Sequence, residues 1–534
     1  MVRPRLFPGA LCIATLLAAP AAQAEDGAQP AASSATESAP ETKNAGQEKL
    51  DQATEAKLAA EDVGDLNKVI TLCEEALSAG LDESNTKFAN ELLSSTLTQR
   101  AELACTELFE RQMPAPRARK ILLGALADLE QTLKINKEQS VAQYLAGRLY
   151  GQLGEKEKAI TALDNAIRLS DEDPEAKARA LVLRANLKTD EADRKADFDE
   201  AARLTPKDPD VLRYRGMFHL SQSKPEPALA DFLAALELEP DHAETHEAAG
   251  LALSQLQKYD EAMEQFNKAI ELAPESSGAY TNRGRVRAIK GDTAAALADV
   301  EQALKLQPGS VQALQLHAAL LSSTGKFDRA LSDLNLLRRA MPDNVDLLLQ
   351  IAALHQASHQ PAKAIATYDM VLVTDADNVN AYRGRADAYL SQGKQAEALA
   401  DYQKANEIDP KNSGVLNNLA WVLATSTDDK LRDGKRAIEI AKQACEVTEY
   451  KQAHILSTLA AGYAESGDFD SAIEWSKKAV ALGADGLKEQ LQKELESYEA
   501  HKPWREALPP QDDPANNDQG SSPDDNETAR KREN

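Results

Sequence analysis

The sequence is poor in aromatic residues, cysteine and long apolar runs. Aromatic residues make up 4% of its 534 residues although 43% of residues are hydrophobic, a balance that is typical of alanine-rich helices. The alternation of polar and apolar residues that marks half-buried strands is absent. Beyond the N-terminal stretch, no apolar run approaches the roughly 20 residues that a membrane-spanning helix needs. These absences predict an all-helical protein with no integral membrane segment after its N-terminus.

Common catalytic signatures are also missing. There is no phosphate-binding loop, no Gly-X-Ser-X-Gly elbow, no dinucleotide fingerprint and no His-Glu-X-X-His motif. His242 and His246 are spaced by four residues, as are His355 and His359, so each pair could share a helical face. Two imidazoles are too few for a zinc site, and a solvated helix start explains them better. We therefore predict no enzymatic activity, no metal and no cofactor.

Positive charge is in deficit. The chain has 61 Lys and Arg against 86 Asp and Glu, which gives a formal net charge of −25. Phosphate backbones need a basic surface, so nucleic acid is excluded as an expected partner.

The first 24 residues are typical of an export signal. Arg3 and Arg5 precede an apolar stretch from residue 6 to residue 19, and a small-X-small site ends at Ala24. Cys12 lies inside the apolar stretch without the small residues that a lipoprotein signal places before its cysteine. Cleavage after Ala24 is therefore favoured over lipid anchoring, and the mature protein is expected in the periplasm or outside the cell.

The mature chain keeps three cysteines, Cys73, Cys105 and Cys445, all on predicted helices. An odd number leaves at least one unpaired. Cys73 and Cys105 could form a disulfide or could serve as small buried apolar residues, and both alternatives remain open. Cys445 is expected to be inert.

A 34-residue period dominates the middle of the chain. A proline recurs at each period with one exception, a small residue follows ten positions later, an alanine twelve positions after that, and a bulky residue four positions further on. The lattice points are Pro206, Pro240, Pro274, Pro308, Pro342, Ala376 and Pro410; the small residues are Gly216, Gly250, Gly284, Ala318, Ala352, Ala386 and Ala420; the alanines are Ala228, Ala262, Ala296, Ala330, Ala364 and Ala398; the bulky residues are Phe232, Phe266, Val300, Leu334, Tyr368 and Tyr402.

This pattern resembles the tetratricopeptide repeat (TPR), a helix-turn-helix unit of 34 residues. Two antiparallel helices approach closely only where both carry small side chains, and a leucine at such a point would cost roughly 1 to 3 kcal/mol through overpacking. The proline then ends the second helix. The resemblance implies an all-α protein, a right-handed α-solenoid of about nine to ten helix-turn-helix units with capping helices.

The lattice extends beyond its regular core in both directions, and polar segments flank it. Apolar periodicity predicts helices from Ser84 to Arg111 and from Arg117 to Ile135, with a leading cap helix from Asp65 to Ala79. The flanking segments are too polar to order themselves. We predict a signal peptide at 1–24, a disordered linker at 25–48, divergent N-terminal helices and cap at 49–139, two TPR units at 140–208 with the second degenerate, six regular units at 209–412, two degenerate units at 413–485 with a loop insertion in the first, a C-terminal cap helix at 486–502 with the apolar stripe Leu487, Leu491, Leu495 and Tyr498, and a disordered acidic tail at 503–534.

In TPR proteins the first helix of each unit lines the concave face, chiefly through its second, fifth, sixth, ninth, twelfth and thirteenth residues. These positions hold the acids Asp210, Glu244, Glu247, Asp346 and Asp387 and the bases Arg213, Arg285 and Arg383, so the groove is less acidic than the whole chain. The groove could bind a peptide or could be an ordinary solvated face. The predicted partner-binding residues are Arg213, Tyr214, Asn282, Arg285, Gln315, Gln350, Arg383, Asn417, Asn418 and Trp421.

The densest basic stretch comprises Arg283, Arg285, Arg287 and Lys290, and only Arg285 is expected to point into the groove. It could bind a carboxylate or could pair with neighbouring acids. The carboxylate clamp of some chaperone-binding TPR proteins needs lysine at the fifth position and asparagine at the ninth. No unit here has that pair, so that activity is not expected.

We predict a non-catalytic scaffold of the bacterial cell envelope that binds protein or peptide partners along the concave groove. One alternative is a homo-oligomeric structural spacer of the envelope. Another is an accessory subunit or a relative of a TPR-containing glycosyltransferase. Residues 417–421, the loop 425–434 and residues 459–475 also resemble the C-terminal arrangement of secreted TPR proteins of planctomycete bacteria.

Overall fold

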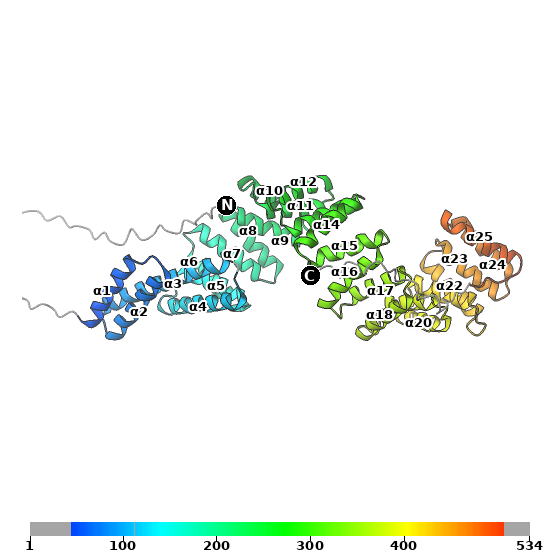
Figure 1. Ribbon diagram of the computed structural model, residues 1–534, viewed down its shortest axis with the longest axis horizontal. Helices are drawn as coiled ribbons and strands as arrows, with labels where there is room; N and C mark the ends of the chain where they lie inside the picture. Colours follow the sequence, from blue (N-terminus) through cyan, green and yellow to red (C-terminus); the bar gives the residue numbers. More distant parts are fainter. Residues whose placement is uncertain (1–43, 112, 507–534) are drawn as a thin grey trace, which may run out of the picture. The chain divides into compact units, whose positions relative to one another are not determined.

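The computed structural model describes residues 44–111 and 113–506 (Figure 1). Every regular element in these residues is an α-helix, which confirms the predicted fold class. None of the helices described is both long and apolar enough to cross a membrane. The predicted signal peptide, most of the predicted linker and most of the predicted tail lie outside the described residues.

The chain divides into two compact units, Met1–Ser170 and Asp171–Asn534. In the first unit, each odd-numbered helix packs against the helix that follows it, which gives three helix pairs in the described residues. Its helices are α1 (Ala45–Leu58), α2 (Val63–Ala79), α3 (Glu83–Glu110), α4 (Ala115–Ile135), α5 (Ser140–Gln152) and α6 (Lys156–Leu169).

Helix α1 was not predicted, because its start lies inside the predicted linker. The side chain of Asn44 caps the helix by accepting a hydrogen bond from the Gly46 amide at 3.2 Å. Gly46 lies against the carbonyl oxygen of Gly80, where no side chain would fit. Leu50 and Ala53 are buried. The helix predicted as a leading cap, α2, is therefore the second member of a pair, and the expectation of disorder up to residue 48 is wrong.

The second unit continues the pairing through α24 and ends with the single helix α25. Residues 209–412 contain six helix pairs, one for each predicted regular unit. The helices are α7 (Pro174–Leu187), α8 (Glu191–Leu204), α9 (Pro209–Ser221), α10 (Pro225–Leu238), α11 (Ala243–Gln255), α12 (Tyr259–Leu272), α13 (Ser277–Ile289), α14 (Thr293–Leu306), α15 (Val311–Ser323), α16 (Phe327–Ala340), α17 (Val345–Ala357), α18 (Pro361–Thr374), α19 (Val379–Leu390), α20 (Gln395–Ile408), α21 (Ser413–Thr425), α22 (Gly434–Val447), α23 (Ala453–Glu465), α24 (Phe469–Leu482) and α25 (Asp485–Glu499).

Within a regular pair, a small residue of the first helix faces a bulky residue of the second. A Cβ atom on Gly250 would lie 2.6 Å from the ring of Phe266, and one on Gly216 would lie 2.7 Å from the ring of Phe232. Both rings are fully buried. The contact predicted from the repeat pattern is therefore present, and it sets how closely the two helices approach.

The second helices end at a constant point of the repeat. Helix α10 ends two residues before Pro240, and α18 ends at the same lattice position although Ala376 replaces the proline. The next helix, α19, begins behind Asn378, whose side chain accepts a hydrogen bond from the Ala381 amide at 2.9 Å. Capping residues therefore mark the boundary together with the prolines.

Partly buried ion pairs form a second repeating contact. Arg215 of α9 donates to both carboxylate oxygens of Asp231 in α10, at 2.6 and 2.9 Å. It also lies 3.8 Å from Asp199 of α8, so one side chain joins its own pair to the preceding one. We call this series the arginine ladder. Its other members are Arg184 with Asp197, Arg283 with Asp299, Arg385 with Asp401, and His317 with Asp333, where histidine takes the place of arginine.

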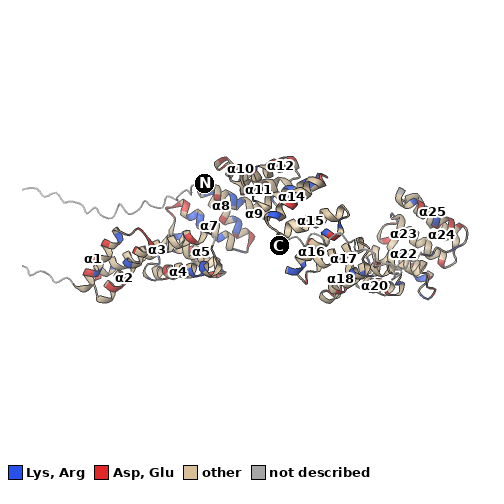
Figure 2. Cartoon of the chain, in the orientation of Figure 1, with Lys and Arg blue, Asp and Glu red and all other residues tan. Residues whose placement is uncertain are grey.

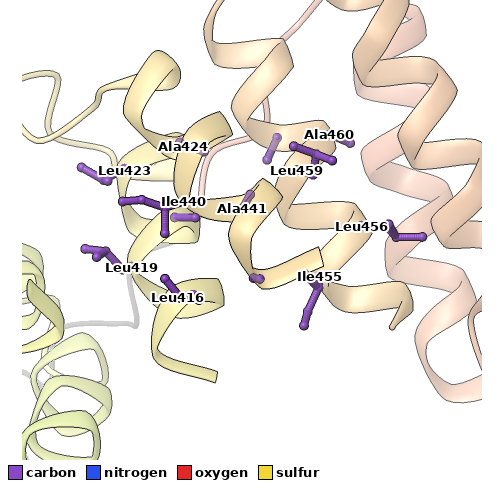
Figure 3. Close-up of a cluster of buried hydrophobic side chains, with 14 of the residues drawn as sticks. Leu416, Leu419, Leu423, Ala424, Ile440, Ala441, Ile455, Leu456, Leu459 and Ala460 are labelled. Atoms are coloured by element: carbon purple, nitrogen blue, oxygen red, sulfur yellow. The ribbon is translucent and has the colours of Figure 1, made fainter. Parts of the chain in front are cut away.

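The last two helix pairs share one continuous core. Figure 3 shows side chains of α21, α22 and α23 that meet there, among them Leu419, Ile440 and Leu459. Helix α25 covers α24 and buries Leu491, Leu495 and Tyr498, three of the four residues in its predicted stripe. The fourth, Leu487, is 44% exposed, because it lies in the first turn of the helix before the packed part begins.

Glu494 is a buried carboxyl group in this cap, with only 1% of its surface exposed. It accepts hydrogen bonds from the hydroxyl of Ser457 and, at 3.0 Å, from the side-chain amide of Gln490. Burial raises the pKa of Glu494, although both hydrogen bonds oppose that rise.

Cys73, Cys105 and Cys445 are free thiols and are buried. Cys73 packs with Val69, whereas Cys105 packs in a separate cluster with Leu122. Burial raises the pKa of each thiol to about 11, so all three remain protonated at neutral pH. The sequence left open whether Cys73 and Cys105 form a disulfide or serve as small buried apolar residues. The structure supports the second alternative, because both are buried and unpaired.

The substitution Gly250→Leu is expected to destabilise the second unit, because the new side chain must displace the ring of Phe266. We expect a loss of roughly 1 to 3 kcal/mol in the free energy of unfolding, measured by urea denaturation followed by circular dichroism. Gly124→Leu is the matched control, since Gly124 lies exposed in α4 with no atom near its missing Cβ. It should gain up to about 1 kcal/mol from helix propensity. A similar loss in both variants would contradict this packing.

Glu494→Gln is expected to change stability with pH. The contribution of a carboxyl group with a raised pKa is fully present below the ordinary glutamate value of about 4.3 and is lost as pH rises through the raised value. The amide cannot ionise, so the variant should have a higher Tm than the parent at about pH 7.5 and little advantage at about pH 4.5. Glu496→Gln, at an exposed position of the same helix, is the control. An equal Tm difference at both pH values would contradict the assignment.

Candidate partner-binding face

Most first helices of successive pairs lie side by side in the second unit. Helix α9 contacts α11, α11 contacts α13, α13 contacts α15, α17 contacts α19 and α21 contacts α23, whereas no two second helices in the described residues make comparable contacts. A stack of repeats curves toward the side on which its helices are closest. The first helices therefore form the concave side, and we call their second, fifth, sixth, ninth, twelfth and thirteenth residues the groove positions.

Two of the predicted partner-binding residues are engaged within the fold. Arg213 pairs with Asp210 at 2.5 Å and with Glu239 at 2.8 Å, and its side chain is only 16% exposed. Asn282 is 8% exposed and donates a hydrogen bond to Glu247 at 2.9 Å. Both side chains use their polar groups inside the protein, so they are less available to a partner than their positions suggest.

Glu247 lines a hollow of about 260 Å³ between α11, α12 and the start of α13. Glu244 and Glu275 also border it, and the hydroxyl of Ser276 donates to Glu247 at 3.1 Å. Burial raises the pKa of Glu247, against the hydrogen bonds from Ser276 and Asn282. The acidic lining favours cationic over anionic groups at this point of the groove.

Four predicted residues are open to solvent. Tyr214 is 47% exposed, and Arg285, Gln315 and Gln350 are also exposed. The side chains of these four residues make no hydrogen bond or ion pair to another described residue. Three of them follow one another on α13, α15 and α17, so one cation and two amides remain free along consecutive first helices.

Arg285 differs from the basic residues around it. Arg283 and Arg287 lie 2.7 and 2.8 Å from the carboxylate of Asp299, and Lys290 pairs with Asp260. The sequence left open whether Arg285 would pair with a neighbouring acid, and in the structure it does not. Acidic and basic residues are interspersed along the helices (Figure 2). An arginine without an acidic partner at a groove position is therefore an exception among the basic residues around it.

Arg383 and Asn418 belong to a polar cluster around Asp387. The hydroxyl of Tyr402 donates to Asp387, as does the amide of Asn418 at 3.2 Å. Burial raises the pKa of Asp387, while both hydrogen bonds and the positive charge of Arg383 oppose that rise. Arg383 itself is half-buried and forms no ion pair with the residues described. The cluster links α19, α20 and α21 at the groove.

Asn417 and Trp421 are held by contacts from later in the chain. Asn417 accepts a hydrogen bond from the Thr458 hydroxyl at 2.8 Å. The indole N–H of Trp421 donates to the carboxylate of Glu506 at 3.0 Å. Glu506 follows α25, in the segment predicted as disordered tail, so the start of that prediction is wrong. A described part of the tail lies against a predicted partner-binding residue.

The histidine pairs serve the helix ends and turns. His242 accepts a hydrogen bond from the Thr245 amide at 3.2 Å and so caps α11, and His246 contacts Gln265 at 2.7 Å. His359 has a φ of 56° at the turn between α17 and α18. Burial lowers the pKa of His355. Among the described residues, no group of three or more His, Cys, Asp or Glu side chains is placed to hold a metal ion.

A second hollow, of about 380 Å³, was not predicted from the sequence. Tyr450 stacks on Trp475 with ring centroids 5.6 Å apart, and the ammonium group of Lys478 lies 3.9 Å from the Trp475 ring centroid. Leu482, also on its lining, is 54% exposed. A tryptophan and a leucine seven residues apart near the end of one helix were the only signal for it in the sequence.

Sequence models of the tetratricopeptide repeat match several parts of the chain. A model described as "TPR repeat" matches residues 386–425, and models described as "Tetratricopeptide repeat" match residues 141–173, 215–277 and 247–311. The match at 141–173 covers the pair α5 and α6, and the others run from within α9 to the start of α15 and from within α19 to the end of α21. The matched segments, which together span less than half of the chain, are thus similar to tetratricopeptide repeats, and TPR arrays generally act as protein-interaction scaffolds. No curated protein matches the sequence significantly.

Several solved TPR structures are similar to the chain. One is YrrB, described as a TPR protein with an unusual peptide-binding site, with 25% identity over 35% of this chain and 95% of that one and a TM-score of 0.30. A TPR protein from Parabacteroides merdae has 22% identity over 45% and 97% of the two chains, with a TM-score of 0.34. Yeast Tom70 has 15% identity over 85% and 96%, with a TM-score of 0.35.

The two kinds of arginine are expected to respond differently to truncation. Arg285→Ala removes no contact and should change the free energy of unfolding by less than about 0.5 kcal/mol. Arg215→Ala leaves the buried carboxylate of Asp231 without its main cation and should cost about 2 kcal/mol. Urea denaturation of both variants measures the difference. Equal losses would mean that Arg285 has a structural partner.

Proposed function

We propose that the protein is a non-catalytic scaffold that binds an extended segment of a partner protein along the first helices of its regular units. The observation that carries this proposal is the open row of Arg285, Gln315 and Gln350. In an array whose other arginines are largely paired internally, these three groove residues keep their polar groups free. Free donors and acceptors on a rigid concave surface suit recognition of a peptide backbone.

The chemistry of the row also describes the partner. An amide side chain can donate to and accept from a peptide backbone, and an unpaired guanidinium favours a carboxylate. The acidic hollow at Glu247 lies on the first helix before Arg285 and favours a cation instead. We infer a partner segment that carries a basic residue toward α11, an acidic residue at α13 and uncharged residues over α15 and α17.

The proposal includes an envelope location. Support comes from the first 24 residues, whose arginines, apolar stretch and small-residue site are typical of a cleaved export signal. We infer that the mature scaffold acts in the periplasm or outside a bacterial cell. The resemblance of the C-terminal units to secreted planctomycete TPR proteins agrees with that location and remains a prediction from the sequence.

Site-specific photo-crosslinking tests the groove. A photoreactive phenylalanine analogue would replace Gln315 or Gln350 in the mature chain, and matched controls would replace Lys305 of α14 or Arg339 of α16. These control residues are exposed on second helices of the neighbouring pairs. After irradiation in an envelope extract of the source organism, the groove positions should yield a protein adduct that the control positions lack.

The adduct should also decrease when Arg285 is replaced by glutamate, because the charge that favours an acidic residue is reversed. Equal crosslinking at groove and control positions would contradict the concave site. An adduct that contains only a second copy of this chain would support the homo-oligomeric spacer, and light scattering over a range of concentrations would then measure its size.

A further inference from the structure

The described residues after α25 turn back across the end of the array. The turn is made at His501, whose φ of 55° is in the left-handed region. The amide of Lys502 donates to the carbonyl of Ser497 at 2.9 Å, and the Ser497 hydroxyl donates to the carbonyl of Lys502 at the same distance. The chain then leaves α25 in a non-helical conformation.

Three consecutive side chains hold this segment in place. Trp504 packs against the core of the last two helix pairs. Arg505 lies 2.6 Å from the carboxylate of Glu465, and Glu506 accepts the indole hydrogen bond of Trp421 at 3.0 Å. The backbone amide of Glu506 donates to the carbonyl of Thr425 at 3.0 Å. We call residues 503–506 the strap.

The strap lies on groove positions. Trp421 and Thr425 are the ninth and thirteenth residues of α21, and the guanidinium of Arg505 lies 3.4 Å from the carbonyl of Ala424, the twelfth. Among the ninth residues of earlier units, Arg285 and Ala319 are exposed, whereas Leu251 and Asp387 are half-buried. The protein therefore carries a short non-helical segment of its own on the surface where the proposed function places a partner peptide.

The surface under the strap keeps its charge balance without it. Glu465 has a second cation, Arg432, whose Nε lies 2.8 Å from its Oε1, while Arg505 lies against Oε2. Removing Arg505 would therefore not leave Glu465 uncompensated, so the usual penalty for breaking a buried pair is reduced. One hydrogen bond between backbone groups, from the Glu506 amide to the Thr425 carbonyl, joins the strap to α21. These features suit a segment that binds and leaves rather than a permanent part of the core.

We propose that the strap is an internal ligand of the groove, and that its seat on α21 and α23 binds a segment with the order aromatic, arginine, acid. The inference deepens the proposed function and rests on it in one respect. If a partner peptide binds the groove as proposed, it must displace the strap before it can extend over α21. Binding of the strap sequence itself is independent of any partner.

The test uses a fluorescent peptide with the sequence of residues 501–508, measured by anisotropy. In the parent chain the strap competes from a high effective concentration and should exclude the peptide. In the full-length variant Arg505→Glu, repulsion from Glu465 should vacate the seat, and we expect the peptide to bind at least tenfold more tightly than to the parent. Lys502→Glu is the matched control, since it makes the same charge change next to the strap.

Two further measurements separate the outcomes. A peptide with glutamate in place of its arginine should not bind. The double variant Trp504→Ala with Arg505→Glu should bind the native peptide at least as tightly as the single variant Arg505→Glu. Helicity per residue should be unchanged in both protein variants. Failure of the peptide to bind either folded variant, or equal binding to parent and variants, would overturn the proposal. If crosslinking at Gln315 persists while peptide binding fails, the strap hypothesis is wrong and the groove function stands.

Discussion

The contact between a small residue on one helix and a bulky residue on its partner is the constraint on which the regular pairs depend. Because the Phe266 ring fills the space beside Gly250, the two helices can approach closely without leaving a void. Repetition of that contact every 34 residues gives successive pairs the same internal geometry. The first helices then lie next to one another. The shape of the surface they form is therefore set by packing between helices and not by the residues exposed on that surface.

The repeating part of the fold could be predicted because packing imposes it on the sequence at fixed intervals. The prediction held even at Ala376, where the proline is missing, because Asn378 caps the next helix at the expected position. The errors fell at the ends, where no neighbour repeats the pattern. Helix α1 buries little beyond Leu50 and Ala53 in a charged segment, and Leu487 lies in an open first turn, so apolar spacing alone misjudged both.

The candidate site could be predicted as a surface but not as a set of free side chains. Helical spacing placed Arg213 and Arg285 on the same face, yet one pairs with Glu239 and the other has no partner in the described residues. That difference depends on acids in other elements, whose distances a linear sequence does not contain. Trp421 is the clearest case, because its partner Glu506 is 85 residues away. A tryptophan two residues after the expected helix end was too weak a signal to predict a folded segment there.

The arginine ladder makes the joints between neighbouring units unequal. Side chains of the ladder reach carboxylates of the preceding pair at α9, α15 and α19 and the Asn267 amide at α13, where Lys290 adds an ion pair with Asp260, but α11 and α17 carry Ala249 and Ile351 at the equivalent position. Apolar contacts fail within a few tenths of a nanometre of separation, whereas ion pairs act over a longer range that shortens as salt rises. Under a pulling force the six regular pairs would therefore separate first at these two apolar joints, and α11 to α16 would move as one block of three pairs.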